Sequence, residues 1–351
     1  MTTSSPTPPT PYIPSMSSQV KASEALRVGV IGTGGMGRRH ALNLHQHIGD
    51  ARVVAIYDLD TARADKVAAE CGGARTFADP VRLIEDASVD AVVIASPDAT
   101  HTGYTLAALE RSKPVMCEKP LGLSGADALR IVEAERATGK TLVSVGFCRR
   151  FDPQHVAVRE MVVAKSLGRA LVYKGVHRNA EVVDGILAET VLVNSAGHDI
   201  DAARWMLGQE VKSVWVQALR AHPSTSPATR DLVLIQLGLT GDCLATIEVF
   251  VSADYGYEVT AEVVTERGSV ITLQPDHALV RSKGGRGVHV PSDWLARFQA
   301  GYVAEMRAWV NAVRTGTLFP GARSEDGYQA MRVTDACIAS VRSGQVQRLE
   351  S

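Results

Sequence analysis

Short apolar runs alternate with amphipathic segments through the first half of the chain. The runs are apolar at consecutive positions, which is typical of strands buried on both faces of a parallel sheet. Between them, Ser124 is a predicted helix N-cap, and Gly72 and Gly139 are predicted helix ends. The alternation predicts an α/β fold, a Rossmann-type doubly wound parallel sheet that ends near Phe147. The predicted strands are 26–31, 52–58, 91–96, 114–117 and 141–147, and the predicted helices are 61–72, 105–112 and 124–139.

Beyond residue 150 the pattern changes, because predicted strands now follow one another. Turn residues such as Thr240-Gly241-Asp242 and Arg267-Gly268 join some of them, so a second α/β domain with a mostly antiparallel open sheet is predicted. One helix at roughly 195–207 interrupts the series, and two long helices end the chain. The predicted strands are 170–178, 211–220, 231–239, 243–251, 257–265 and 269–273, and the final helices are 295–316 and 324–344.

The start of the chain has a different composition. Residues 1–24 are rich in Pro, Ser and Thr and have no apolar period, so we expect a disordered tail. They also lack the basic start and apolar core of a signal peptide. We therefore expect three parts: the tail, a dinucleotide-binding domain at 25–147 and a substrate-binding domain at 148–351.

Composition and charge exclude several functional classes. The 351 residues carry a net charge of −1, which gives no electrostatic argument for binding nucleic acid or an anionic membrane. No apolar run of about 18 residues predicts a membrane span. The five cysteines are scattered without a C-x-x-C pair, so neither a disulfide framework nor a metal site is predicted, and a cytoplasmic setting fits best.

A glycine-rich turn follows the first predicted strand. Gly32, Gly34 and Gly37 have G-x-G-x-x-G spacing, and the residues from Met36 onward read as the start of a helix. The glycines allow a tight turn and close approach of a pyrophosphate, while the helix N-terminus offers free N–H groups. The second strand ends in Asp58, which can bond both ribose hydroxyls and repel a 2′-phosphate. The combination predicts NAD as cofactor, although an ordinary strand–helix unit with a glycine turn is the simpler alternative.

Two candidate catalytic groups follow later in the chain. Glu118-Lys119-Pro120 follows directly on the strand 114–117, which puts Lys119 at the carboxyl edge of the predicted sheet, where it could polarise a substrate hydroxyl. His198 suits proton transfer with an alcohol, and Asn194 lies one helical turn before it. The alternatives are a surface lysine in a loop and a histidine with a structural role at a helix start.

Taken together, these motifs resemble the Gfo/Idh/MocA family, whose members are nicotinamide-dependent sugar and cyclitol dehydrogenases. The resemblance covers nearly the whole chain after the tail and is strongest to the inositol dehydrogenase branch. It implies a Rossmann domain followed by an α/β domain that also pairs subunits into dimers or tetramers. The motifs are GVIGTGGMGRRH, CEKPLG, GFCRRFD, HRN, NSAGHDIDAARWMLG and the tail pattern DWLARFQAGYVAEMRAW with DGYQA.

The resemblance also implies roles for individual residues. Lys119 would contact the reacting hydroxyl and His198 would accept its proton. Tyr255 and Tyr257 bracket one pocket tyrosine, and the sequence does not decide between them. For His101, a structural role at a helix start and a place beside the cofactor are equally good alternatives. The implied substrate-binding residues are Arg149, His177, Asn194, Tyr255 and Tyr257, and the implied cofactor-binding residues are Gly32, Thr33, Gly34, Gly35, Met36, Gly37, Asp58, Ser96, Pro97, His101, Glu118 and Lys119.

One position departs from the family pattern. Inositol dehydrogenases usually carry an aspartate four residues before the histidine, and this chain has Asn194. An aspartate would stabilise the imidazolium form of His198, whereas an asparagine contributes no charge. We expect NAD-dependent oxidation of a secondary hydroxyl of a cyclitol, without a metal. The alternatives are an amino-cyclitol, aldose or amino-sugar as substrate, or a regulatory protein that binds NAD without chemistry.

Overall fold

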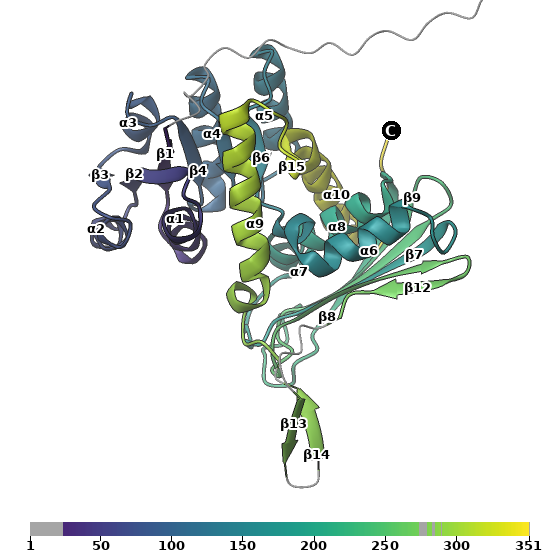
Figure 1. Cartoon of the computed structure of the whole chain (residues 1–351). Helices are drawn as coiled ribbons and strands as arrows, with labels where there is room; N and C mark the ends of the chain where they lie inside the picture. The colour runs from purple at the N-terminus through teal and green to yellow at the C-terminus, as the bar shows by residue number, and fades with distance from the viewer. Residues whose placement is uncertain (1–23, 274–278, 283–284, 289, 351) are drawn as a thin grey trace, which may run out of the picture.

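The computed structural model describes residues 24–273, 279–282, 285–288 and 290–350. The disordered tail expected at 1–24 therefore lies outside the described residues, apart from Glu24. Two seven-stranded sheets, each with helices against it, form the body of the molecule (Figure 1). The predicted class, a Rossmann sheet plus an α/β domain with an open sheet, is confirmed.

The first sheet has the strand order β15-β6-β5-β4-β1-β2-β3. Strands β1 to β6 run parallel, with pairs β1–β2, β1–β4, β4–β5, β5–β6 and β2–β3. The order reverses direction at β1, which is the switch point of a doubly wound fold. The strands are β1 Leu26–Ile31, β2 Ala51–Tyr57, β3 Arg75–Phe77, β4 Ala91–Ile94, β5 Val115–Cys117 and β6 Val143–Val145. The helices are α1 Gly35–His47, α2 Thr61–Glu70, α3 Pro80–Glu85, α4 His101–Glu110 and α5 Gly125–Ala137.

The end of the chain completes this first sheet, which the sequence pattern did not predict. Strand β15 Ala322–Arg323 pairs antiparallel with β6 at the sheet edge. Helix α9 Trp294–Thr315 inserts Met306, Trp309 and Val310 into the core formed by β1, β2 and α1. The pattern of the first 147 residues could not reveal strands and helices supplied from so far along the chain. The three-residue strand β3 and the six-residue helix α3 were also missed, because both are too short to show a period.

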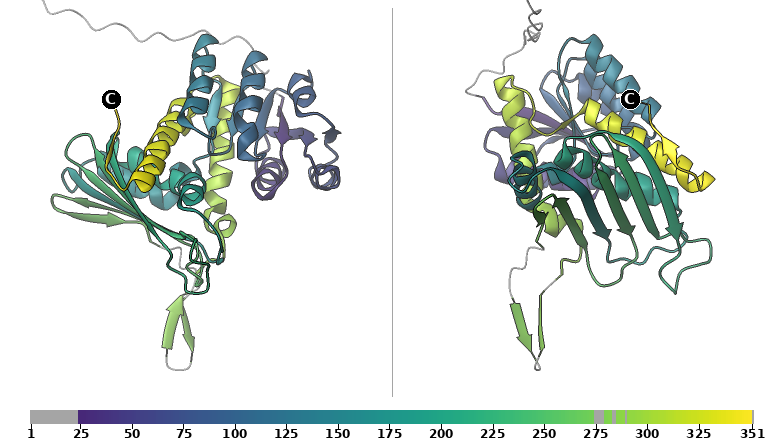
Figure 2. Two further views of the ribbon diagram at one scale, coloured as in Figure 1. Left: turned by 180° about the vertical axis from the view of Figure 1, so that it is seen from behind. Right: turned by 90° about the vertical axis from the view of Figure 1, so that its right-hand side faces the viewer.

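The second sheet has the order β12-β11-β7-β10-β9-β8-β16. All of its pairs are antiparallel except β7–β10, which is parallel. The strands are β7 Ala170–Arg178, β8 Val211–Leu219, β9 Leu232–Leu239, β10 Leu244–Phe250, β11 Glu258–Thr265, β12 Gly268–Ile271 and β16 Gln347–Arg348. Helices α6 Pro153–Val163, α8 Gly197–Leu207 and α10 Ser324–Ser343 lie against one face (Figure 2). A separate hairpin, β13 Leu279–Ser282 and β14 Gly285–Val288, projects away from both sheets (Figure 1).

Most predicted element ends are close to those observed. Ser124 caps α5 by accepting a hydrogen bond from the N–H of Asp127 over 3.1 Å. Gly72 and Gly139 both have positive φ, +81° and +66°, where a glycine is favoured. The predicted helix 195–207 is observed as α8 Gly197–Leu207, but the helical segment begins earlier than predicted. A short helix α7 Ala188–Val191 and a π-helical turn η3 Leu192–Ala196 precede α8.

Candidate active site

The glycine turn after β1 has the shape of a dinucleotide cradle. Gly32 has φ +87°, and a Cβ there would lie 2.5 Å from the main-chain oxygen of Ala95. At Gly34 and Gly35 a Cβ would instead meet open space. No side chain of the described residues caps the N-terminus of α1, so its first N–H groups are available for an anion. The residues present fit a bound pyrophosphate at this turn.

Asp58 follows β2 and points at the same turn. Its Oδ2 accepts hydrogen bonds from the N–H of Thr33 over 2.6 Å and from Thr33 Oγ1 over 2.7 Å. Arg63 pairs with both carboxylate oxygens, Nη2 to Oδ1 over 2.7 Å and Nε to Oδ2 over 3.1 Å. Burial opposes ionisation, but these bonds and the N–H of Asp60 lower the pKa of Asp58 to about 2. Asp58 is therefore an anion at the position expected for the adenosine ribose.

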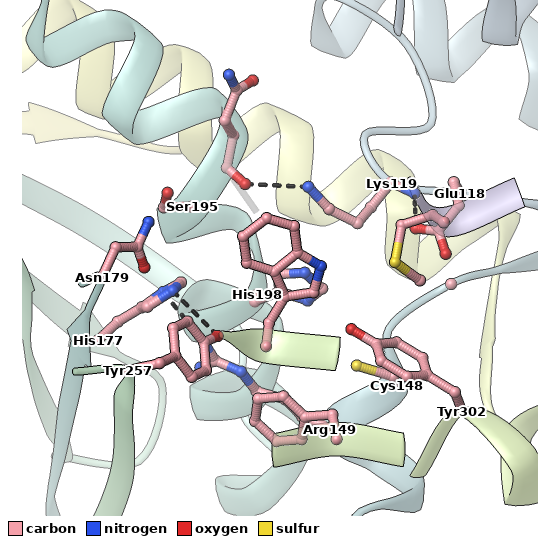
Figure 3. A pocket seen from close by; sticks show the side chains of 15 residues that line it. Glu118, Lys119, Cys148, Arg149, His177, Asn179, Ser195, His198, Tyr257 and Tyr302 are labelled. Atoms are coloured by element: carbon pink, nitrogen blue, oxygen red, sulfur yellow. Dashed lines mark hydrogen bonds between the residues drawn. The ribbon is translucent and has the colours of Figure 1, made fainter. Parts of the chain in front are cut away.

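A cavity of about 260 Å³ lies between the carboxyl edge of the first sheet and the second domain. Its wall combines charged, amide and aromatic groups (Figure 3). Such a wall suits a compact polar ligand that must be held in one orientation. The lining residues are Met36, Glu118, Lys119, Gly146, Cys148, Arg149, His177, Asn179, Asn194, Ser195, His198, Tyr257, Trp294, Phe298 and Tyr302.

Lys119 reaches into this cavity from the end of β5. Its Nζ donates a hydrogen bond to the main-chain oxygen of Asn194 over 3.0 Å (Figure 3). The Lys119–Pro120 peptide bond is cis. Asn194 lies in the π-helical turn η3, a widened form that often occurs at functional sites. The turn replaces the regular helix expected before His198, yet Asn194 and His198 both line the cavity.

His198, at the start of α8, is enclosed by protein groups. Its ring packs edge-on against Phe147, with 5.9 Å between ring centroids. Burial lowers the pKa of His198 well below its ordinary value, and the positive charges of Lys119 and Arg149 lower it further. Its Nδ1 is buried and has no hydrogen-bond partner among the described residues. His198 is therefore a neutral imidazole at neutral pH.

Arg149, Asp199 and His177 form a buried ionic cluster on the opposite wall. Asp199 pairs with the Arg149 guanidinium and lies 2.9 Å from His177 Nδ1. Burial opposes its charge, but Arg149 and His177 lower the pKa of Asp199 to about 2. Burial lowers the pKa of His177, which is thus neutral. His177 Nδ1 lies within hydrogen-bond distance of two groups, Asp199 Oδ2 at 2.9 Å, which can only accept, and Arg149 Nη2 at 3.1 Å, which can only donate.

The structure distinguishes between the two candidate tyrosines. Tyr257 is 4% exposed, lines the cavity and places its hydroxyl 3.4 Å from His177 Nε2. Tyr255 is 51% exposed and bonds to Glu258 and Arg178, away from the lining. The structure therefore supports Tyr257 as the pocket tyrosine and not Tyr255.

The remaining predicted cofactor residues occupy different places. Glu118 lines the cavity, and its Oε1 lies 2.6 Å from His40 Nε2. Ser96 lies against Gly32 in the glycine turn, with Pro97 next in the chain. His101 faces the interior instead, where its Nδ1 and Nε2 bond to the main-chain oxygens of Pro120 and Ser96 over 2.7 and 2.9 Å. The structural alternative for His101 is thus the one that its contacts favour.

Sequence reasoning missed several residues of this cavity, and also Asp199, which lies behind its wall. Asp199 stood beside His198 in the same motif, and the doubled arginine of GFCRRFD offered a signal for buried acidic partners. Trp294, Phe298 and Tyr302 have a spacing of four residues, which places them on one face of α9. Asn179, Ser195 and Cys148 gave no signal of their own. In the described parts of the chain, no group of three or more His, Cys, Asp or Glu could hold a metal ion, and no helix is long and apolar enough to cross a membrane.

A dinucleotide cradle next to a cavity with a lysine and a neutral histidine defines an oxidoreductase of the two-domain α/β class. The profile of the oxidoreductase family with an NAD-binding Rossmann fold matches residues 26–147, and the profile of its C-terminal alpha/beta domain matches residues 160–349. The chain belongs to this family, Gfo/Idh/MocA, and is an NAD-binding oxidoreductase.

Individual relatives agree with this assignment. An inositol 2-dehydrogenase of Rubrobacter xylanophilus is 47% identical over 94% of this chain and 94% of its own length. Inositol 2-dehydrogenase 2 of Saccharopolyspora erythraea is 41% identical over 93% of this chain and 96% of its own. The crystal structure of myo-inositol dehydrogenase from Lactobacillus casei in complex with NAD(H) and myo-inositol has a TM-score of 0.88 at 29% identity, covering 93% of this chain and 97% of that one.

Proposed function

We propose that this chain oxidises a secondary hydroxyl group of a cyclitol, myo-inositol or a related inositol, to the ketone with NAD. The observation that carries the proposal is that Lys119 and the neutral His198 share one cavity beside the dinucleotide cradle. The names of the relatives from Rubrobacter xylanophilus and Saccharopolyspora erythraea support a cyclitol as the substrate class.

The N-terminal domain would hold the cofactor. The glycine turn receives the pyrophosphate at the N-terminus of α1, and Asp58 receives the adenosine ribose. Met36 and Glu118 border the end of the cradle that opens into the cavity. When bound there, the nicotinamide ring supplies an acceptor for the hydride that leaves the substrate carbon. The negative charge of Asp58 would favour NAD over NADP.

Lys119 and His198 would divide the proton chemistry. The Lys119 ammonium donates a hydrogen bond to the reacting oxygen and stabilises the negative charge that develops on it. His198 accepts the hydroxyl proton, which only a neutral imidazole can do. Burial and the neighbouring cations keep it neutral at the pH of the reaction. No metal is needed for this polarisation, because Lys119 supplies the positive charge.

The opposite wall would position the ring of the substrate. Arg149 offers N–H donors, and the His177 ring and the Tyr257 hydroxyl can each donate or accept. Asn194 adds an amide on the side of Lys119. Donors and acceptors on all sides suit a compact ring that carries a hydroxyl group on each carbon.

Asn194 favours a second candidate within the same reaction class. The resemblance to inositol dehydrogenases predicts an aspartate at this position, and a neutral amide suits a different set of substrate groups. An amino-cyclitol, an aldose or an amino-sugar is therefore the alternative substrate. A regulatory protein without chemistry would need neither Lys119 nor a neutral His198.

A panel of polyols tests the proposal. Formation of reduced cofactor is followed by absorbance with myo-, scyllo- and chiro-inositol, glucose and an amino-cyclitol, each with NAD and with NADP. We expect the highest kcat/KM for an inositol with NAD. No turnover of any member, with NAD binding intact, would contradict the proposal, and preference for glucose or the amino-cyclitol would select the alternative substrate.

Replacement of Lys119 tests its part in the reaction. Lys119→Ala should lower kcat by roughly two to four orders of magnitude, the scale of a lost proton-transfer or electrostatic group. The Kd for NAD should change little, because the cradle is separate from this side chain. A variant that keeps more than about a tenth of the wild-type kcat would exclude Lys119 as the polarising group.

We also propose that the chain works in the cytoplasm as a homo-oligomer, a dimer or tetramer. The scattered, unpaired cysteines support a reducing compartment. The second sheet supports pairing of subunits, because Leu234 on β9 and Leu244 on β10 are 41% and 59% exposed on the face turned away from the helices.

A further inference from the structure

The carboxylate of Asp58 is already saturated with hydrogen bonds. Oδ2 accepts from Thr33 N, Thr33 Oγ1 and Arg63 Nε, and Oδ1 accepts from Asp60 N and Arg63 Nη2. Both hydroxyls of an adenosine ribose must reach these same two oxygens. Thr33 and Asp60 N are fixed by the turn and by the start of α2, so Arg63 is the partner that can move.

Arg63 is well placed to move. It lies in the first turn of α2, and its side chain is 47% exposed although Asp58 is buried. Its third nitrogen, Nη1, lies 3.8 Å from Asp60 Oδ2. A guanidinium that loses Asp58 therefore remains at the rim of the ribose site with its donors free. There it would face whatever group is attached to the ribose 2′ oxygen.

We propose that Arg63 is a specificity-determining residue that forms a subsite for a 2′-phosphate and thereby limits the discrimination of this chain against NADP. The inference extends the proposed function, because it concerns the same cofactor site. With NAD, the ribose hydroxyls replace Arg63 on Asp58. With NADP, Arg63 pairs with the 2′-phosphate, as a guanidinium does bidentately.

The charges of the site set the direction of the preference. Two carboxylates, Asp58 and Asp60, lie around one guanidinium, so NAD remains favoured over a cofactor with an added dianion. Without Arg63 the repulsion of the 2′-phosphate would be uncompensated. The same change would free Asp58 for the ribose hydroxyls. The two cofactors should therefore respond in opposite directions.

Binding measurements on the full chain test the proposal without turnover. The Kd values of NAD, NADP, 5′-AMP and adenosine 2′,5′-bisphosphate are measured by titration calorimetry for the wild type, Arg63→Ala and Arg63→Lys. For Arg63→Ala we expect the Kd of NADP and of the bisphosphate to rise about tenfold, the scale of one hydrogen bond to a charged group. The Kd of NAD and 5′-AMP should stay the same or fall. Arg63→Lys, which keeps the charge and loses the bidentate fork, should be intermediate.

Arg111→Ala is the matched control, because it removes another helix-end arginine paired with a carboxylate, Glu85. It should leave all four Kd values unchanged. An equal loss of affinity for both members of each pair in Arg63→Ala would overturn the proposal and make Arg63 a support for Asp58 only. If the ratio of the NADP Kd to the NAD Kd is the same in Arg63→Ala as in the wild type, the proposal is overturned as well. The AMP pair contains no nicotinamide, so these outcomes are distinct from a failure of the proposed dehydrogenase activity.

Discussion

At the residue scale, two histidines of the cavity differ in their partners. His177 has a carboxylate, Asp199, and a guanidinium, Arg149, within hydrogen-bond distance of its Nδ1. The buried Nδ1 of His198 has no partner among the described residues. Asp199 follows His198 directly in the chain, yet its carboxylate contacts the ring of His177. His177 is therefore suited to hold a hydroxyl group, and His198 is the ring that is free to change its protonation state.

Asn194→Asp should restore a charge beside His198. A carboxylate there stabilises the imidazolium and raises the pKa of His198. Since His198 must be neutral to accept a proton, the acid limb of kcat/KM should move to higher pH, by about one unit for each 1.4 kcal/mol of added interaction. The pH–rate profile on the best substrate of the panel measures this shift. Activity on myo-inositol should rise or hold.

The same variant separates the two candidate substrates. If Asn194 selects another substrate, the introduced carboxylate leaves one of its groups unpaired and costs about 1 to 3 kcal/mol in kcat/KM. The order of substrates in the panel would then change. If neither the pH profile nor this order changes, Asn194 plays no part in the reaction.

Glu305 on α9 is an acid in the interior of the protein. It is fully buried, and neither carboxyl oxygen has a hydrogen-bond partner among the described residues. Burial raises the pKa of Glu305 well above its ordinary value, and the nearby charge of Glu118 adds to the effect. The folded protein therefore takes up a proton here. Protonation of Glu305 therefore contributes to the stability of the fold. The contribution is complete below the pKa of this group in the unfolded chain, and it is lost as the pH rises through its pKa in the folded protein.

Glu305→Gln should keep the neutral form at every pH. Relative to wild type, its free energy of unfolding should improve by about 1.4 kcal/mol per pH unit above the unfolded pKa of about 4.3, until the folded pKa is reached. Urea unfolding at pH 5, 6, 7 and 8 measures the difference. Glu110→Gln, at an exposed position of α4, is the matched control. A difference that is constant with pH would show that Glu305 is ionised in the folded protein.

At the element scale, helix α9 joins the cavity to the core of the first sheet. Its first turns place Trp294, Phe298 and Tyr302 on the cavity wall. Its later turns bury Met306 and Trp309 between α1 and the parallel strands. One rigid helix thus couples the shape of the cavity to the packing of the cofactor domain.

Trp309→Ala should therefore destabilise the domain that binds NAD. Trp309 is 1% exposed, and its removal leaves a cavity that costs about 3 to 5 kcal/mol. Its Nε1 is buried without a partner among the described residues, so Trp309→Phe removes no hydrogen bond and should lose much less. Denaturant unfolding of both variants measures these losses. A loss below about 1 kcal/mol for Trp309→Ala would mean that α9 does not depend on this contact.

At the scale of the whole molecule, the second sheet has a face that no helix covers in the described part of the chain (Figure 2). We expect this face to pair with a second copy. Leu234→Glu combined with Leu244→Glu should place charges on it and reduce the mass measured by light scattering. Leu318→Glu, at a position 64% exposed outside that sheet, is the control. An unchanged mass in the double variant would place the subunit contact elsewhere.

Much of the fold could be predicted from the sequence because its signals are local. Buried parallel strands are continuous apolar runs, and strands with one face covered alternate between apolar and polar residues. The predicted bounds of β7, β9 and β11 are therefore within one or two residues of those observed. The π-helical turn at 192–196 could not be predicted this way, because it changes the spacing without changing the composition. Strand β15 could not be predicted either, because two residues carry no period.

The sequence by itself determined the strand–helix alternation of the first half, the glycine turn and the place of Lys119 at a sheet edge. Each of these follows from backbone demands within a few residues, such as the positive φ of Gly32. Only the tertiary structure decided that Tyr257 and not Tyr255 faces the cavity, that Asp199 serves His177, and that Arg63 occupies Asp58. These choices depend on how elements pack across separations such as the 75 residues between Lys119 and Asn194. A hydrophobic pattern records which face of a segment is buried, but it does not record which other segment covers that face.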